Sequence, residues 1–106
     1  MQSNDQSYRE FSALMKRHAF ADAVSLAERQ SVAAGDRSEF WLTQLSVALR
    51  ESGKLREALE AADKACGIAP GSAWPLLARA EALLKKGDSD AAAADFQAAQ
   101  HHCRPF

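Results

Sequence analysis

The stretch LRESGKLREALEAADKACGIAP, residues 49–70, decides the fold of this chain. Apolar residues recur at i, i+3 and i+4 on both sides of Gly53, which is the spacing of helices that each bury one face. These positions are Leu42, Leu45 and Leu49 before the glycine and Leu55, Ala58, Leu59, Ala62 and Ala65 after it. Glycine is costly inside a helix and suits the left-handed position just past a helix end. The stretch therefore predicts two helices joined by a turn at residues 52–54.

A third helix is predicted after this hairpin. Pro70 and Gly71 close the second helix, and Ser72 is placed to cap the next one. Pro75 then falls within a first turn, where its missing N–H does no harm. No window of the chain alternates apolar and polar residues at period two, whereas helical spacing is frequent. We therefore expect an all-α fold.

The chain also repeats itself at an offset of 34 residues, since Leu42 is matched by Leu76 and Gly53 by Gly87. The other identities pair Ala48 with Ala82, Leu49 with Leu83, Ala58 with Ala92 and Ala65 with Ala99. They fall on a leucine stripe, on the glycine between the helices, and on small residues where two helices must approach closely. A fixed period of this length indicates a second packing unit of the same kind.

In these residues the sequence resembles the tetratricopeptide repeat (TPR), a 34-residue helix–turn–helix unit with the pattern W-x2-L-G-x2-Y, A-x3-F and P. The middle unit carries Leu42, Leu45, Ser46, Leu49, Ala58, Ala62 and Pro70, and the last carries Leu76, Ala80, Leu83, Ala92 and Phe96, with Pro105 one place late. The first unit fits through Leu14, Phe20, Ala23 and Ala27, but Phe11 stands where a small residue is expected and Gly35 where proline is. The resemblance implies a single domain, residues 1–106, folded as a right-handed α-solenoid of three stacked TPR-like hairpins, with units at about 4–37, 39–72 and 73–106.

The physical sense of this pattern is that one hairpin cannot bury both of its faces. Small residues let adjacent helices come close, while large ones fill the space between them. The small set is Ala58, Ala62, Ala65, Ala80, Ala92 and Ala99, and the large set is Leu42, Leu49, Leu55, Leu76, Leu83 and Phe96. A closed bundle of five or six helices would use the same apolar spacing and is the alternative; the fixed offset favours the stack.

Composition excludes several classes of partner. With 13 Lys+Arg against 14 Asp+Glu, the chain has no field that would attract a nucleic acid. It contains neither a signal peptide pattern nor an apolar run of about 18 residues that could span a membrane. Cys66 and Cys103 are too few for a disulfide framework. We therefore expect a cytoplasmic protein with no nucleic-acid or membrane partner.

The TPR resemblance also implies where a ligand would bind, because the first helix of each hairpin lines the concave groove. The positions it implies are Phe40, Thr43, Val47 and Arg50 in the middle unit, Trp74, Leu77, Glu81 and Leu84 in the last, and Asp5, Tyr8, Ser12 and Met15 in the first. Such a groove is apolar and suits a helix or an extended peptide anchored by large side chains. The alternatives are that Trp74 packs over the preceding unit and that at least one of the adjacent residues Phe40 and Trp41 is core.

Some TPR proteins hold a peptide's terminal carboxylate with Lys, Arg and Asn side chains on their first helices. The places that correspond to this clamp carry Tyr8, Ser12, Gln44, Trp74 and Ala78. The basic residues are missing, so we expect no carboxylate clamp and no chaperone-tail binding of that type.

No catalytic or metal-binding pattern is found. His101, His102 and Cys103 are ligand types, as is Cys66, but adjacent helical residues point about 100° apart and no C-x2-C or H-x3-H spacing supports a site. Asp88 and Asp90 lack the spacing of a calcium loop, so a turn and a helix cap are expected there. His18 is expected at the exposed end of the first helix. The sequence predicts no enzyme activity, cofactor or metal.

The preferred function is therefore a non-enzymatic protein–protein interaction or scaffold module that binds another protein or peptide in the groove. A regulatory or assembly module of a larger multidomain enzyme is the alternative. Repeat arrays need a polar-faced terminal helix, yet only HHCRPF follows Gln100. Two hypotheses address this end: the chain is a fragment of a longer protein, or it self-associates as a homo-oligomer through the uncapped C-terminal repeat near Phe96 and Phe106.

Overall fold

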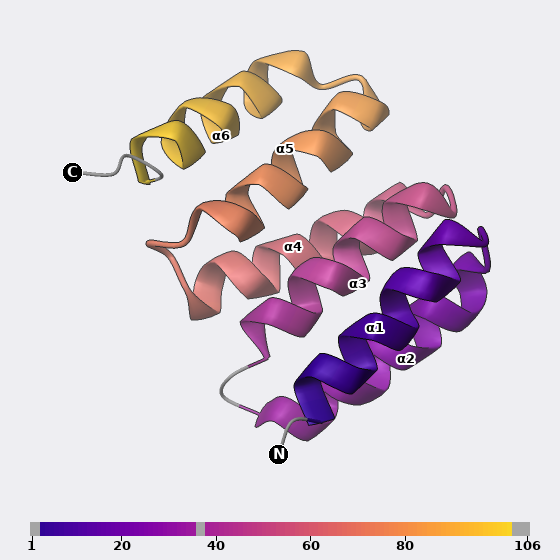
Figure 1. Cartoon of the computed structure of the whole chain (residues 1–106). Coiled ribbons are helices and arrows are strands. Elements are labelled where there is room, and N and C mark those ends of the chain that lie inside the picture. The colour runs from indigo at the N-terminus through magenta and orange to yellow at the C-terminus, as the bar shows by residue number, and fades with distance from the viewer. Residues whose placement is uncertain (1–2, 36–37, 103–106) are drawn as a thin grey trace.

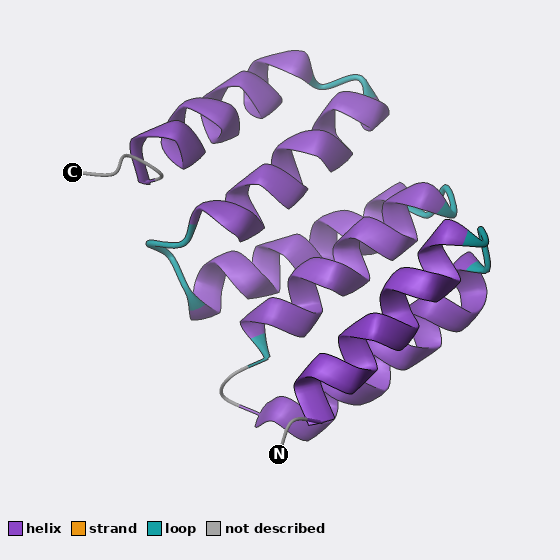
Figure 2. Cartoon of the chain, in the orientation of Figure 1, coloured by secondary structure: helices purple, strands orange, loops and turns teal. Residues whose placement is uncertain are grey.

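The computed structural model describes residues 3–35 and 38–102, and these residues form six α-helices and no strand. The helices are α1 (Ser3–Lys16), α2 (Phe20–Ala34), α3 (Glu39–Glu51), α4 (Leu55–Ile68), α5 (Ala73–Lys86) and α6 (Ser89–His102). Short loops join them into successive antiparallel pairs (Figure 2). The all-α prediction is confirmed. Cys103, Pro105 and Phe106 lie outside the described residues, and so do the side chains of Asp5 and His102.

The helices are stacked in the order of the chain. Within each hairpin the two helices pack on each other, and between hairpins α2 packs on α3 and α4 on α5. α6 lies at the opposite end of the stack from α1 and α2 (Figure 1). Because each hairpin contacts its neighbours in the chain, the arrangement is an open stack, and the alternative of a closed bundle is wrong. None of the described helices is both long and apolar enough to cross a membrane.

Two of the three hairpin turns use glycine as expected. Gly53 has φ 89° and Gly87 has φ 99°, both in the left-handed region. The amide of Gly87 donates to the carbonyl oxygens of Leu83 and Leu84 and so closes α5. In the first hairpin the same conformation is adopted by His18, with φ 62°, where a side chain is strained. His18 is exposed as predicted, but its left-handed backbone was not anticipated.

The predicted helix punctuation around α5 and α6 is confirmed in its positions. Ser72 is the residue before α5 and has extended backbone angles, although its hydroxyl makes no capping hydrogen bond. Pro75 lies in the first turn of α5 and is fully buried. Before α6, the Asp88 carboxylate accepts a hydrogen bond from the amide of Ala91 at 3.4 Å, which is a weak cap. Asp88 therefore belongs to a turn and cap, as expected.

Alanines form the contact surfaces between helices. All six alanines of the predicted small set are buried, none being more than 1% exposed: Ala58, Ala62, Ala65, Ala80, Ala92 and Ala99. Of the predicted large set, Leu42, Leu49 and Leu76 are buried, whereas Leu55, Leu83 and Phe96 are partly exposed. Ser46 lies among these residues and donates a buried 2.8 Å hydrogen bond to the carbonyl oxygen of Ala58. This bond ties α3 to α4.

A charged cluster joins α4, α5 and α6. The Arg79 guanidinium on α5 donates to both carboxylate oxygens of Asp95 on α6, at 2.8 and 3.0 Å, and to Asp63 on α4 at 2.9 Å. The hydrogen bonds to Asp95 raise the pKa of Arg79 above its ordinary value. Burial raises the pKa of the nearby Cys66 thiol, although the Arg79 cation acts in the opposite direction. The Arg79 cluster thus fixes the last hairpin on the middle one.

Candidate functional site

The first helices of the hairpins, α1, α3 and α5, define the surface where the sequence predicts ligand binding; we call it the first-helix face. α1 and α3 run in front of α2 and α4 in Figure 1. α5 packs beside α3, while α1 meets α3 largely through side-chain rings. The face therefore combines side chains that lie far apart in the sequence.

One end of this face is aromatic. The Tyr8 ring on α1 meets the edge of the Phe40 ring on α3 at a centroid distance of 5.6 Å. Phe40 also contacts Trp41 at 5.2 Å, but Phe40 is 37% exposed and Trp41 only 1%. The prediction that at least one of the adjacent rings is core is therefore confirmed. Phe11 supports them from below, since it is buried and meets Trp41 edge-on at 6.0 Å.

The two predicted groove residues Arg50 and Glu81, which carry opposite charges, contact each other. Arg50 on α3 forms an ion pair with Glu81 on α5 and a second one, at 3.0 Å, with Glu51 on its own helix. The Arg50 side chain is largely covered in this cluster, with 13% exposed. Because the single cation Arg50 is shared between two carboxylates, it is not available to an acidic ligand, and this part of the face keeps one net negative charge.

The remaining predicted positions differ in how much surface they offer. Thr43 is buried, and its hydroxyl donates to the carbonyl oxygen of Glu39 at 2.8 Å, so it presents little to solvent. Val47 and Leu77 are half-buried. Leu84 is about half exposed, and Trp74 is 71% exposed at the start of α5. This exposure contradicts the alternative that Trp74 is packed over the preceding unit.

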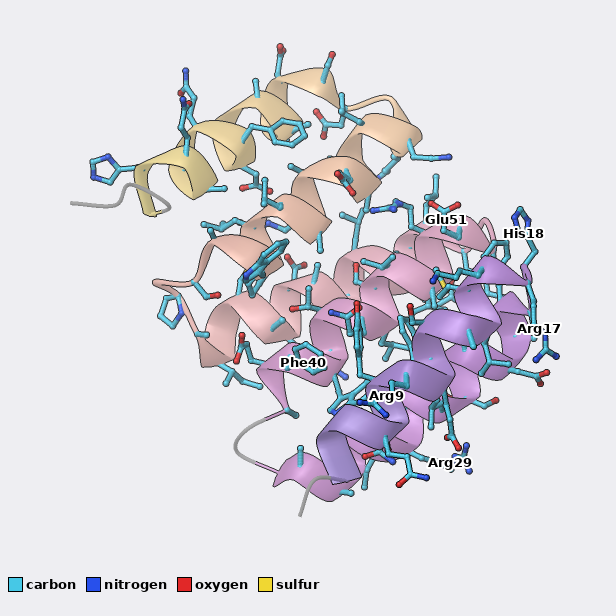
Figure 3. All side chains as sticks on the ribbon, in the orientation of Figure 1. Arg9, Arg17, His18, Arg29, Phe40 and Glu51 are labelled. Atoms are coloured by element: carbon cyan, nitrogen blue, oxygen red, sulfur yellow. The ribbon has the colours of Figure 1, made fainter. Side chains whose placement is uncertain are left out.

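Sequence reasoning missed one cation beside this site. Arg9 is exposed on α1 and lies on the same side of the molecule as Phe40 (Figure 3). The TPR groove positions of the first unit include Tyr8 but not the next residue, Arg9. The family pattern therefore did not predict Arg9 as a binding residue. Its charge was visible only as one of the 13 basic residues of the chain.

No metal centre is found in the part of the chain that the structure describes. No group of three or more His, Cys, Asp or Glu side chains within residues 3–35 and 38–102 is arranged to hold a metal ion. Cys66 is a free, half-buried thiol whose pKa is raised by burial, which is the opposite of an activated nucleophile. What the first-helix face offers chemically is exposed apolar and aromatic surface.

Solved structures with the same arrangement of helices are TPR proteins and their relatives. The type III secretion translocator chaperone SycD of Yersinia enterocolitica superposes with a TM-score of 0.87 at 17% identity, over 96% of this chain and 75% of SycD. The Sgt2 TPR domain of Aspergillus fumigatus gives 0.87 at 20% identity, over 96% and 67%. PcrH, in complex with the chaperone-binding region of PopD, gives 0.82 at 17% identity, over 97% and 78%. SycD is also known in complex with a peptide of the translocator YopD.

The chain therefore has a TPR-like fold of stacked helical hairpins, and the resemblance noted in the sequence is confirmed at the level of the fold. No protein-family model matches the sequence, and no curated protein matches it. At identities of 17 to 20%, the likeness to SycD and Sgt2 concerns the backbone arrangement alone.

Proposed function

We propose that this protein is a non-enzymatic interaction module that binds one peptide or helix of a partner protein on its first-helix face. The observation that carries the proposal is a set of large apolar side chains exposed on α1, α3 and α5. Its members are Tyr8, Phe40, Trp74 and Leu84. Side chains of this kind anchor a peptide, because a buried aromatic ring contributes large contact area at little cost in side-chain entropy.

The structural neighbours support a peptide as the ligand. SycD has been solved with a peptide of YopD and PcrH with a region of PopD, so this helical stack can accommodate such ligands. Because Arg50 is held by Glu51 and Glu81, it is not available to bind an acidic group, which favours an apolar anchor at this part of the face. Arg9 is exposed on α1, directly after Tyr8 in the sequence, and favours an acidic residue in the ligand next to its apolar anchor.

The proposal extends to the organisation and location of the chain. The three units, at about 4–37, 39–72 and 73–106, would act as one domain, because a single hairpin leaves an apolar face uncovered. The ligand would be met in the cytoplasm, where the free thiol of Cys66 would stay reduced.

Tryptophan fluorescence offers a direct test. Trp74 is 71% exposed and Trp41 is 1% exposed, so iodide quenches Trp74 selectively in the free protein. A library of peptides with Leu, Ile or Phe anchors should contain sequences that protect Trp74 from iodide, and calorimetry then gives the dissociation constant. We expect Phe40→Ala and Trp74→Ala to weaken such a peptide about tenfold or more. Val32→Ala is the matched control, because Val32 is 82% exposed on α2, away from this face.

The result that would contradict the proposal is equally specific. If peptides bind with the same affinity to Phe40→Ala, Trp74→Ala and the wild type, while Val32→Ala weakens them, the ligand lies elsewhere. If no peptide protects Trp74 from the quencher, these exposed side chains do not form a peptide site.

A further inference from the structure

The outer side of the first hairpin carries a second surface feature, a groove between α1 and α2 with a volume of about 390 Å³. Midway along it lie the half-buried Leu14 and the exposed Ala13 and Ser25, above the buried Leu26. Four charged residues surround them, namely Glu10 and Arg17 on α1 and Asp22 and Arg29 on α2, all of them exposed. We call this feature the outer groove.

The outer groove faces away from the rest of the stack. Its residues are spaced i, i+3, i+4 and i+7 along both helices, so each helix contributes one continuous stripe. On α1 this stripe lies opposite the side that carries Tyr8 and Phe11, whose rings meet α3. Arg17 and Arg29 accordingly point away from α3 in Figure 3. No other described helix covers the outer groove.

The four charges are arranged in a pattern with opposite signs at neighbouring corners. Because α1 and α2 are antiparallel, Arg17 and Asp22 lie at the end with the turn, and Glu10 and Arg29 lie at the other end. The two acids therefore occupy one diagonal of the outer groove and the two arginines the other. The ion pairs formed by the described residues include none between these four side chains, so their charges remain available across the groove.

A surface of this kind is complementary to itself. A two-fold axis parallel to the helices brings Glu10 opposite Arg29 of a second copy and Arg17 opposite Asp22. A two-fold axis across the helices brings Glu10 opposite Arg17 and Asp22 opposite Arg29. Either axis joins opposite charges and superimposes the centres of the two grooves, which is what a symmetric, isologous interface requires.

We propose that the outer groove is a homodimerisation surface that binds a second copy of this chain through a two-fold axis. Ala13, Leu14 and Ser25 form the centre of the interface, and the four charges of each copy pair with opposite charges at the rim. The first-helix face lies on another side of α1, so the dimer leaves it free to bind a ligand. The surface also lies at the opposite end of the stack from the C-terminal repeat.

Paired charge-reversal variants test this directly. Arg17→Glu with Arg29→Glu surrounds the outer groove with four acids, and Glu10→Arg with Asp22→Arg surrounds it with four bases. Sedimentation equilibrium across a concentration series at low salt should show the wild type dimerising and each double variant at least tenfold weaker. An equal mixture of the two variants should form a dimer with one copy of each. Added salt should weaken both dimers, because their rim charges are screened.

Two controls make the outcome decisive. Lys85→Glu with Lys86→Glu makes the same change of charge at the end of α5 and should leave the wild-type dimer intact, and circular dichroism confirms that every variant is folded. A wild type that stays monomeric throughout the series overturns the proposal. A dimer that persists in both charge-reversal variants also overturns it. The same holds if Phe96→Asp dissociates the dimer and the charge reversals do not.

Discussion

The first and middle hairpins pack their helices in the same arrangement but with different residues at the same repeat positions. Where α3 has Ser46, which bonds the carbonyl oxygen of Ala58, α1 has Phe11, a ring that is 3% exposed and packs on Trp41. At the turn, the middle hairpin has Gly53 and the first has His18, both with positive φ. The comparison teaches that the repeat fixes the backbone path, while the space between helices adapts to the side chain present.

The largest effect is expected from removing the ring that distinguishes the first hairpin. Phe11→Ala leaves a cavity against Trp41, and a buried Phe→Ala change costs about 3–5 kcal/mol of the free energy of unfolding. Urea denaturation followed by circular dichroism measures this loss. Tyr8→Ala is the control, because Tyr8 is 42% exposed and its loss should cost far less. Equal losses for the two variants would show that Phe11 is not the packing centre of this hairpin.

The last hairpin depends on a charged cluster in place of an aromatic one. Asp95 is buried and holds Arg79 through two hydrogen bonds, so Asp95→Ala leaves a partly buried guanidinium without its main partner. We expect this variant to lose about 2 kcal/mol of the free energy of unfolding. Asp63→Ala removes the third hydrogen bond, but the Asp63 side chain is 61% exposed, so its loss should stay below about 0.5 kcal/mol. A larger loss for Asp63→Ala than for Asp95→Ala would mean that the contact of Arg79 with α4 contributes more to stability than its contact with α6.

These cases indicate how far sequence reasoning could reach. The period of 34 residues predicted the hairpins, the turns at Gly53 and Gly87, and the six buried alanines, because backbone geometry and close helix approach each demand one residue type. The bidentate contact of Arg79 with Asp95 carries no such signal, since it depends on which rotamers face each other after the helices have packed. The repeat pattern likewise could not predict that the Thr43 hydroxyl would donate a hydrogen bond within its own helix. Because of this bond, Thr43 adds little to the binding face.

Substitutions at the turn residues Gly53 and His18 should change the free energy of unfolding by smaller amounts and in opposite directions. A Cβ at Gly53 would meet no atom within 4 Å, so the cost of Gly53→Ala comes from its φ of 89° and should be about 1 kcal/mol. His18→Gly relieves the same strain at φ 62° and should stabilise the protein by up to about 1 kcal/mol. Thermal unfolding of both variants checks the signs. If His18→Gly is destabilising, the relief of strain is outweighed by the added freedom of glycine in the unfolded chain or by loss of the ring contact between His18 and Phe20 at 5.3 Å.

The smallest effect concerns the reactivity of Cys66, which lies beside the Arg79 cluster of the last two hairpins. Burial raises the pKa of this thiol, so less thiolate is present at any given pH than in an exposed cysteine. In a Cys103→Ser background, alkylation of Cys66 by iodoacetamide at pH 8 should be severalfold slower than alkylation of a cysteine in a short peptide, and its rate should keep rising to higher pH. Arg79→Gln removes the cation that favours the thiolate and should slow the reaction further, provided that circular dichroism shows the variant to be folded. A faster reaction in that variant would show that the Arg79 cluster protects Cys66 by covering it and that its charge has the lesser effect.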